Sequence, residues 1–323
     1  MASGLSHRAG FNVSSRMRAH IESTIESMTD GDAADRAVAF ERHRPRLFGI
    51  AYRMLGTVDD ANDLVQEAYL RWHHADLEAI RAPEAWLVAV TTRLSIDRLR
   101  HSAVERERYV GHWLPEPLVT VPHAADRHTE LASDLSMAFL VLLERLAPEE
   151  RAAFLLREVF DSDYTEIARV LERSEAACRQ MVHRARERVR TERTRFPVAP
   201  ETLARLLERF LEAIRLEDRE SLLALVAPDA TWTSDGGGVV SAARRTVRGR
   251  DRIVRLVLGV ERKWGSHLRY EIAWINGEPA LLTMAGDELI STTSIDTDGG
   301  QFVGFYRVLN PEKLRNVRRS VGR

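Results

Sequence analysis

Arginine, glutamine and histidine side chains recur along one segment of this chain, residues 173–195. The segment holds eight arginines against three glutamates, whereas the formal net charge of the whole chain is −1. Arginine and glutamine form paired hydrogen bonds with guanine and adenine edges in the major groove, and further arginines neutralise phosphates. The segment therefore favours recognition of duplex DNA. A solvated helix with ion pairs along its surface is the plain alternative.

The spacing places these side chains on one face of a helix. Four residues recur at helical intervals and predict an apolar stripe: Cys178, Val182, Ala185 and Val189. The face opposite the stripe presents Ala176, Arg179, Gln180, His183 and Arg186. Such a helix buries its stripe and offers its polar face to a partner.

The stretch "DSDYTEIARVLER" comes directly before this helix. We expect Thr165 to cap a short helix here, and a brief turn over residues 172–174 to join the two helices. A short helix, a tight turn and a basic second helix predict a helix-turn-helix, whose second helix enters the major groove. A plain helix-turn-helix repressor is one protein class that fits this pattern.

Length and composition narrow the classes of protein that this chain could belong to. A length of 323 residues predicts two or three domains. Cys178 is the single cysteine, which excludes an intramolecular disulfide and a cysteine-rich zinc site. No apolar run approaches the roughly 20 residues that span a bilayer, and residues 1–35 lack the apolar core of a secretory signal. We expect a cytoplasmic protein with no membrane contact, metal or cofactor.

Patterns of apolar residues divide the chain. Residues 1–35 read as a polar, flexible tail, with Met17 or Met28 as alternative starts. Helical periodicity predicts helical domains over 36–108 and 131–195, and the prolines of 109–130 predict a linker. Residues 196–323 predict two amphipathic helices and then an antiparallel-looking set of strands, an α+β domain. The strand-like runs are 230–234, 268–275, 279–285, 288–295 and 302–309.

The arginine-rich helix and the residues before it resemble a known family. "LAPEERAAFLLREVFDSDYTEIARVLERSEAACRQMVHRARERV" looks like region 4 of the extracytoplasmic-function (ECF) sigma factors, which binds the promoter −35 element. The resemblance implies −35 contacts from eight residues: Ser174, Glu175, Ala176, Arg179, Gln180, His183, Arg184 and Arg186. Glu172 stands where the family usually has a turn glycine, so we expect a turn without positive φ there, or some strain.

Two earlier stretches, "DDANDLVQEAYLRWH" and "PEAWLVAVTTRLSIDRLR", resemble region 2 of the same family, which binds the polymerase and opens the −10 element. The resemblance implies core polymerase contacts from Asp60, Asp63, Gln66 and Glu67. It implies −10 contacts from Arg93, Asp97, Arg98 and Arg100. Melted DNA needs a basic track of this kind and a pocket for an extruded base, without a catalytic residue. We assign Trp86 to the core.

The last region resembles a SnoaL-like domain, a cone-shaped α+β fold of the NTF2-like kind. "WLPEP", "DGGG" and "NPEKL" narrow the resemblance to the SigJ-type subgroup, in which a fused C-terminal domain regulates the sigma factor in place of a separate anti-sigma protein. The implied regulatory contacts are Trp113, Leu114, Pro115, Glu116, Pro117, Asp235, Gly236, Asn310, Pro311, Lys313 and Leu314. We expect Trp113 and Leu114 to bury against this domain; a small local cluster is the alternative.

Relatives of the SnoaL-like fold use an aspartate or histidine as general acid or base. Asp229, Asp235 and His267 are the candidates here. Fold alone does not establish chemistry, so we expect no catalysis. The expected partners are core RNA polymerase, promoter DNA and, as an open alternative, a small-molecule ligand of the last domain. A bifunctional protein with an active cyclase-like domain is the other competing class.

Overall fold

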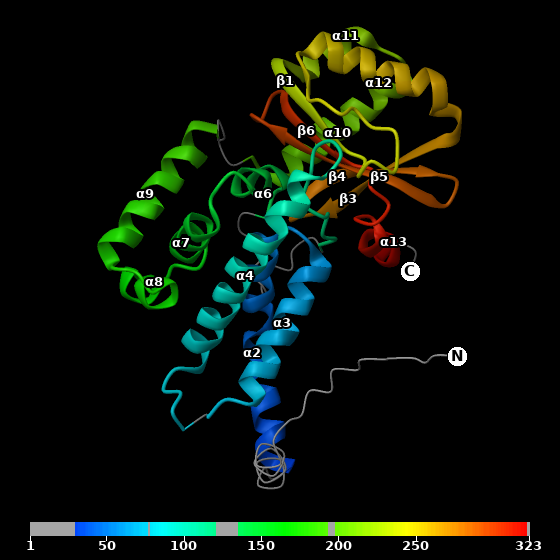
Figure 1. Cartoon of the computed structure of the whole chain (residues 1–323). Helices are drawn as coiled ribbons and strands as arrows, with labels where there is room; N and C mark the ends of the chain where they lie inside the picture. Colours follow the sequence, from blue (N-terminus) through cyan, green and yellow to red (C-terminus); the bar gives the residue numbers. More distant parts are fainter. Residues whose placement is uncertain (1–29, 77, 121–134, 193–197, 322–323) are drawn as a thin grey trace, which may run out of the picture.

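The computed structural model describes residues 30–76, 78–120, 135–192 and 198–321. Two groups of helices form one part of the molecule, and a mixed β-sheet with its own covering helices forms the other (Figure 1). This confirms the predicted fold class of two all-α units followed by an α+β domain. Within the described residues, no helix combines the length and apolar character that crossing a membrane requires.

The first helical unit consists of α2 (Asp30–Leu55), α3 (Val58–His73) and α4 (Pro83–Glu107). Because α2 begins at Asp30, it takes in the last residues of the predicted tail, while residues 1–29 lie outside the described part. Gly56 ends α2 with a φ of 76°, and its amide donates to the Tyr52 carbonyl at 2.8 Å. Pro83 starts α4, as expected, because a first-turn residue needs no amide hydrogen.

The second helical unit consists of α6 (Met137–Leu143), α7 (Pro148–Glu158), α8 (Tyr164–Leu171) and α9 (Glu175–Glu192). The prediction that Thr165 caps α8 was wrong. Asp163 is the cap, and its carboxylate accepts from the Glu166 amide at 2.7 Å. Thr165 lies inside the helix and donates to the Glu175 carboxylate at 2.9 Å. Glu172 adopts a left-handed φ of 53°, so the turn takes the strained option.

The two helical units share one continuous hydrophobic core, in which α4 packs against α7 and α8. The linker prolines favour independent domains, and the structure instead brings the two units into direct contact. The described linker residues end at Thr120; residues 121–134, the rest of the predicted linker and the start of the predicted region 4, lie outside the described part.

The C-terminal domain is built on a six-stranded sheet of order β2-β1-β6-β5-β4-β3. Its strands are β1 (Val226–Asp235), β2 (Val247–Arg248), β3 (Leu268–Ile275), β4 (Glu278–Ala285), β5 (Glu288–Thr297) and β6 (Phe302–Val308). β1 pairs with β6 in parallel, which corrects the expected antiparallel arrangement, and the remaining neighbours are antiparallel. Strand periodicity reports which residues face the core but carries no information on strand direction.

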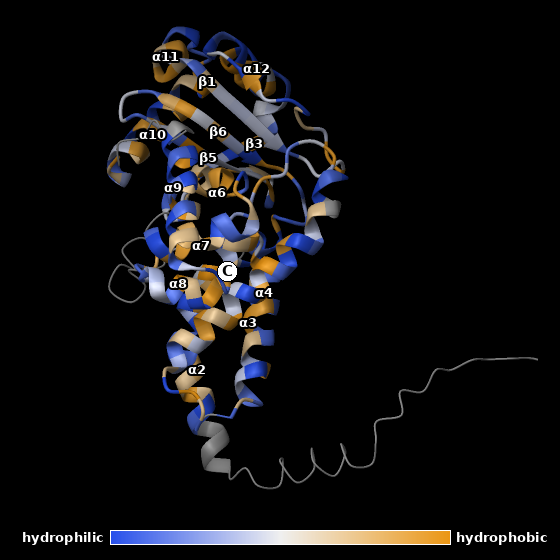
Figure 2. Ribbon diagram, turned by 60° about the vertical axis from the view of Figure 1, so that its left-hand side comes forward, coloured by the Kyte–Doolittle hydropathy of each residue, from blue (hydrophilic) through white to orange (hydrophobic). Residues whose placement is uncertain are grey.

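The two faces of the sheet are covered differently. Its own helices α10 (Pro200–Arg215), α11 (Arg219–Leu225) and α12 (Arg250–Trp264) cover one face, around a core that includes Trp232 and Phe305 with ring centroids 4.9 Å apart. Along these helices hydrophobic and hydrophilic residues alternate (Figure 2). The other face buries Leu282 and Val308 in a third cluster, which includes residues of the linker and of α6.

Two short elements complete the chain, the 3-10 turn η2 (Gly265–His267) and α13 (Arg315–Val321). The strands β1 and β3 to β6 coincide with the predicted runs, although β1 begins earlier, at Val226. The sequence interpretation missed α12, α13 and β2. α13 lies beside the first helical unit rather than over the sheet's helices (Figure 1).

Candidate DNA-binding face and the contacts between domains

α9 presents the polar face that its sequence predicts. Cys178, Val182 and Ala185 are completely buried, because they pack into the shared helical core. The residues expected to contact the −35 element lie on the outside of this helix and the turn before it, exposed except for the half-buried Glu175. A rigid helix held by its apolar stripe can therefore offer these side chains to a DNA groove without rearranging.

Ion pairs cross the exposed face of α9, so the alternative of a solvated helix describes the free protein in part. Arg179 pairs with Glu175 at 2.6 Å and lies over the Tyr164 ring, 5.0 Å from its centroid. Arg186 pairs with Glu158 at 2.6 Å. Exposed pairs of this kind contribute about 0–1 kcal/mol. They are weak enough to exchange for DNA contacts.

Arg179 and Arg190 lie at opposite ends of this face, and we expect their replacement to affect DNA binding differently. Arg179→Ala is expected to cost about 1–3 kcal/mol and to relax the preference at one −35 base pair, because the start of a recognition helix reads bases. Arg190→Ala is expected to weaken binding to all sequences alike and to make the salt dependence shallower. Holoenzyme affinities for matched and mismatched −35 sequences, measured over a salt series, test this. Equal loss on both sequences for both variants would contradict base reading by Arg179.

The residues expected to contact the −10 element are engaged within the molecule. Arg93 donates to the Val170 carbonyl at 2.8 Å and the Arg169 carbonyl at 2.9 Å, and so caps the end of α8. Arg100 pairs with Glu149 of α7 and, at 3.2 Å, with Asp97. Arg93 and Arg100 of α4 therefore face the second helical unit. Trp86 packs against the helical core, 5.8 Å from Trp72 between ring centroids, as expected.

The residues expected to bind polymerase lie along α3. Asp63 and Gln66 are exposed, and Glu67 pairs with Arg71 at 2.8 Å. Asp60 accepts from the Thr57 hydroxyl at 2.5 Å and pairs with Arg98 at 3.2 Å. The start of the same helix meets α13, since Asn316 lies 3.4 Å from an Asp59 carboxylate oxygen. The C-terminal domain thus reaches one end of the acidic face.

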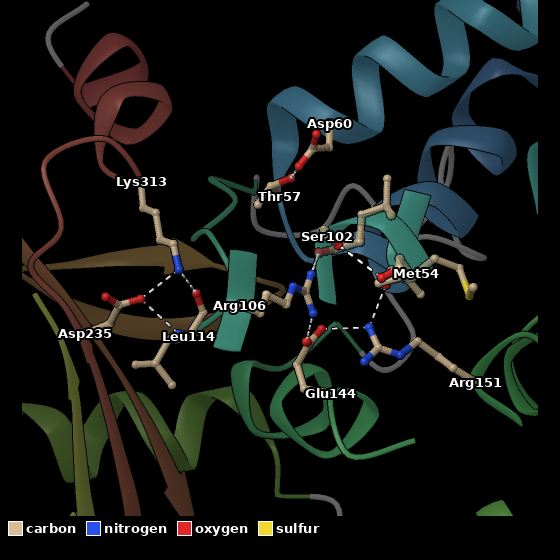
Figure 3. Close-up of polar contacts among 12 residues, drawn as sticks. Met54, Thr57, Asp60, Ser102, Arg106, Leu114, Glu144, Arg151, Asp235 and Lys313 are labelled. Atoms are coloured by element: carbon tan, nitrogen blue, oxygen red, sulfur yellow. Dashed lines mark hydrogen bonds and ion pairs between the residues drawn. The ribbon is translucent and has the colours of Figure 1, made fainter. Parts of the chain in front are cut away.

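A buried ion pair within the C-terminal domain holds the linker through hydrogen bonds (Figure 3). Lys313 donates to the Asp235 carboxylate at 2.7 Å and to the Leu114 carbonyl at 2.5 Å. The same carboxylate accepts from the Leu114 amide at 2.9 Å and the Tyr109 hydroxyl at 2.6 Å. Asp235 has no exposed surface and Lys313 is 8% exposed. We call this set of Tyr109, Leu114, Asp235 and Lys313 the linker clasp.

The clasp predicts a pH dependence. Burial lowers the pKa of Lys313 from 10.5 to about 8. A lysine exposed by undocking regains its ordinary pKa, so the docked form binds fewer protons between about pH 8 and 10.5. Docking is therefore expected to strengthen as pH rises through this window. Below about pH 8 Lys313 is protonated in both forms and adds no pH dependence. Thermal melting of the full chain relative to Lys313→Met, from pH 7 to 10, measures the slope; identical slopes for both proteins would contradict it.

The remaining "WLPEP" side chains pack on both sides of the linker. The Trp113 ring lies between two cations, 4.1 Å from the Arg106 guanidinium and 4.0 Å from the Lys313 ammonium. Leu114 is buried in the third cluster, as expected, and Pro115 and Pro117 are buried too. Glu116 accepts from the Val58 amide at 2.8 Å and from Asn316 of α13 at 2.6 Å. Burial raises the pKa of its carboxyl.

"DGGG" and "NPEKL" meet at the clasp. The Asp235 carbonyl accepts from the Asn310 amide at 3.0 Å, and the Asn310 side chain donates to the Tyr109 hydroxyl at 2.9 Å. A Cβ on Gly237 would come within 2.5 Å of that side chain, and Gly237 has a φ of 62°. A Cβ on Gly236 would meet the Val240 carbonyl at 2.5 Å. Pro311 is half-buried and Leu314 is buried beside them.

Several contact residues were missed in the sequence interpretation. Tyr109 belongs to the clasp, and Asn276 donates to the Tyr52 hydroxyl at 2.6 Å while accepting from the Leu118 amide at 3.2 Å. Glu144 joins α4 to α7 by pairing with Arg106 and Arg151. The dipeptide of Asn276 and Gly277 signals a tight turn, but nothing in the sequence indicates what that turn contacts.

The three candidate catalytic residues do not converge. Asp229 and His267 are exposed, and Asp235 is enclosed in the clasp on the other face of the sheet from the domain's helices. Among the described residues no group of three or more histidine, cysteine, aspartate or glutamate side chains is arranged to hold a metal ion.

Comparison with known proteins identifies the helical units. Residues 39–104 match Sigma-70 region 2, and residues 136–189 match Sigma-70, region 4. The chain is also 38% identical to the ECF RNA polymerase sigma factor SigJ of Mycobacterium tuberculosis (strain ATCC 25618 / H37Rv), over 85% of this chain and 92% of that protein. The chain belongs to the ECF RNA polymerase sigma factors. The predicted family is thereby confirmed.

Two further relatives show that the similarity is not limited to the sigma helices. The probable ECF RNA polymerase sigma factor SigI of the same organism is 31% identical over 88% of this chain and 97% of its own length. The crystal structure of Mycobacterium tuberculosis SigJ matches with a TM-score of 0.71 and 35% identity, covering 87% of this chain and 98% of that one. Coverage of this extent includes the C-terminal domain, so this sigma factor shares its three-part architecture with SigJ.

Proposed function

We propose that this sigma factor directs core RNA polymerase to a specific set of promoters, reading the −35 element with α9 and opening the −10 element with α4. The observation that carries the proposal is the exposed face of Arg179, Gln180 and His183 above a completely buried stripe. Its partners are then core polymerase and promoter DNA, and it acts in the cytoplasm. Alternation of exposed base-reading groups with buried anchors is what a recognition helix requires.

We further propose that the arrangement described here is a closed form of the sigma factor. The −35 and −10 elements are named for their positions on the DNA, so they lie about 25 base pairs apart. This separation is roughly 85 Å of duplex at 3.4 Å per base pair. In the closed form Arg93 of α4 contacts α8 at 2.8 Å. One molecule in this arrangement cannot occupy both elements, so promoter binding requires the two helical units to separate.

The C-terminal domain is placed to regulate that separation. It holds the linker through the clasp, and α13 reaches Asp59 at the start of α3. We propose that this domain acts in the role of an anti-sigma factor, with "WLPEP", "DGGG" and "NPEKL" as the contact surface. We propose no catalytic role for it, because Asp229 and His267 lie on the surface and Asp235 has a structural role in the clasp.

Run-off transcription from a promoter library with added core polymerase tests the main proposal. We expect specific transcripts, and permanganate-reactive thymines at the −10 element that appear only with polymerase. A helix-turn-helix repressor needs only DNA, so it would bind as tightly without polymerase and yield no transcript. If the protein yields no transcript and does not co-purify with core polymerase, it does not act as a sigma factor.

The linker residues give a separate prediction for regulation. Replacing Trp113 and Leu114 together with alanine is expected to change transcript yield several-fold while each domain stays folded, because both side chains join the linker to its neighbours. Transcript yield and thermal melting are measured side by side. Arg108→Ala, at an exposed position directly before the linker, is the control. Unchanged yield with normal melting would reject regulation through this contact.

A further inference from the structure

Residues 244–255 of the C-terminal domain take no part in the contacts described above. Six arginines and one aspartate give them a local charge of +5: Arg244, Arg245, Arg248, Arg250, Arg252 and Arg255, with Asp251. The α9 segment has the same local charge, from eight arginines against three glutamates. Residues 244–248 form a bend and the short strand β2 directly before α12, and we call them the arginine loop.

The arginines of the loop have no acidic partner. Arg244, Arg245 and Arg248 are exposed and form no ion pair within the described part of the chain. The single aspartate, Asp251, pairs instead with Arg219 of α11 at 2.9 Å. α10 shows a plain solvated face in the same domain, since its three arginines alternate with three glutamates. A surface of one sign repels itself, so an anionic partner explains the arginine loop better than solvation alone.

The stability of α12 does not explain the arginines that follow the loop. Arg250 and Arg252 lie in the first turn of this helix. The unpaired amide groups at a helix N-terminus create a positive potential there, so cations in the first turn lower the stability of the helix. These arginines therefore extend the basic surface at a local cost.

The arginine loop lies against the linker just after α4. The Thr246 hydroxyl oxygen is 3.2 Å from Nε2 of His112. The chain before the loop packs on the linker as well, since a Cβ on Gly238 would come within 2.9 Å of the Val110 side chain. Val110 and His112 follow the end of α4 within five residues. The loop is thus placed beside the C-terminal end of the helix that we propose to open the −10 element.

The linker clasp fixes the loop in this position. Asp235 of the clasp begins the "DGGG" turn that leads to the loop, and it accepts from the Leu114 amide at 2.9 Å. The far end of the loop is held by β1, because Arg248 lies in register with Thr231. While the clasp is closed, the arginine loop therefore accompanies α4 to any DNA that this helix binds.

We propose that the arginine loop binds the phosphate backbone of the promoter duplex next to the −10 element. Guanidinium groups form paired hydrogen bonds with phosphate oxygens, and neutralising the phosphates releases condensed counter-ions from the DNA. The position beside the −10 element rests on the proposed function of α4, whereas the affinity of the loop for duplex DNA does not. The C-terminal domain then has a second role, as a phosphate contact, in addition to its proposed regulatory role.

Duplex DNA suits the loop better than an anionic membrane surface does. Segments that bind at a membrane surface insert large apolar side chains such as tryptophan, phenylalanine and leucine, and residues 241–250 contain none of these. α12, which follows the loop, turns Ile253 and Val254 inward, where both are buried. No apolar face beside the arginines is therefore free to enter a bilayer.

Fluorescence anisotropy over a salt series tests the affinity of the loop, with the full chain and a labelled duplex that lacks both promoter elements. The loop variant replaces Arg244, Arg245 and Arg248 together with glutamine. We expect its slope of log affinity against log salt to be shallower by about 2–3, because each phosphate contact contributes about 0.9. Lysine at the same three positions keeps the charges and is expected to preserve most of the slope.

The matched control replaces three exposed arginines of α10 with glutamine, and we expect it to keep the slope of the unaltered protein: Arg205, Arg209 and Arg215. It removes the same number of charges from the same domain. An equal effect of the control and the loop variant would mean that only the net charge matters, which would overturn the proposal.

The same variants in holoenzyme on a promoter fragment test the position of the contact. We expect the loop variant to bind at least tenfold more weakly, by the same factor for matched and mismatched −35 sequences, because phosphate contacts carry no sequence preference. An iron chelate attached to Ser241→Cys, at an exposed position, is expected to cleave the duplex beside the −10 element. Cys178 is completely buried, so the new cysteine is the one that reacts.

Unchanged binding by the loop variant both in the free chain and in holoenzyme would overturn the proposal. Loss of binding to phosphatidylglycerol vesicles, with unchanged binding to DNA, would overturn DNA as the partner. If holoenzyme yields no specific transcript while the free chain still loses slope, the position beside the −10 element is wrong and the loop is confirmed as a DNA-binding surface.

Discussion

Replacing Asp235 with alanine is expected to release the linker from the C-terminal domain, at a cost of about 3–5 kcal/mol in docking free energy. The carboxylate has no exposed surface and accepts from three groups outside its own loop: the Tyr109 hydroxyl, the Leu114 amide and the Lys313 ammonium. Its removal leaves a lysine ammonium buried without a counter-ion, which is the main source of the cost.

Hydrogen exchange of the Leu114 amide measures this release directly, because that amide donates to Asp235 in the docked form. We expect exchange to accelerate by two orders of magnitude or more in Asp235→Ala, as a cost of about 3 kcal/mol implies. Asp229→Ala, at an exposed aspartate six residues earlier on the same strand, is the control. Adding Lys313→Met to Asp235→Ala removes the orphaned charge and is expected to restore part of the protection.

Slow exchange of Leu114 in Asp235→Ala would show that the third hydrophobic cluster alone holds the linker. The linker clasp would then contribute little to the docking of the linker on the C-terminal domain. Partial restoration by Lys313→Met distinguishes a loss of charge balance from a general loss of structure, because a misfolded domain would not recover when a second side chain is shortened.

The sequence predicted those features of the molecule that depend on local periodicity. The stripe of Cys178, Val182 and Ala185 is buried because an interval of three or four residues returns to the same side of a helix. The strands β3 to β6 were predicted because apolar and β-branched runs are bounded by turn residues. The same interval predicted the polar face opposite the stripe, and Arg179, Gln180 and His183 on that face are exposed.

Features that depend on long-range contacts escaped prediction. The parallel pairing of β1 with β6 joins segments separated by most of the domain, and no local pattern encodes it. The Asp163 cap was missed because two neighbouring side chains offer the same chemistry and only their backbone geometry decides between them. Arg93 was interpreted by family resemblance as a DNA contact, and nothing in the sequence places α8 against it.

Glu144 gives the second large expected effect, at the contact between the two helical units. Its carboxylate pairs with Arg106 at the end of α4 and, at 2.7 Å, with Arg151 of α7 (Figure 3). Arg151 is 2% exposed and also donates to the Met54 carbonyl at 2.5 Å. Glu144→Ala leaves this arginine buried without a counter-ion and is expected to cost about 3–5 kcal/mol.

The closed form predicts that this loss of stability is accompanied by a gain in DNA binding. Under this proposal the helical units must separate to reach both promoter elements, so weakening the contact between them lowers the cost of opening. Glu144→Ala is expected to melt at a lower temperature and yet to bind a promoter fragment with both elements more tightly than the unaltered protein. A fragment with only the −35 element should show little gain, because one helical unit reaches it without opening.

Affinities for the two fragments, measured with core polymerase present, test this prediction together with the melting curves. Glu144→Gln keeps the shape and some of the hydrogen bonds, so it is expected to fall between the unaltered protein and Glu144→Ala in both assays. Glu41→Ala, at an exposed ion pair with Arg44 on α2, controls for the loss of one negative charge. If affinity falls together with stability on both fragments, Glu144 only maintains the fold. The contact between the helical units would then be a fixed feature of the sigma factor, and regulation would have to act at the linker clasp alone.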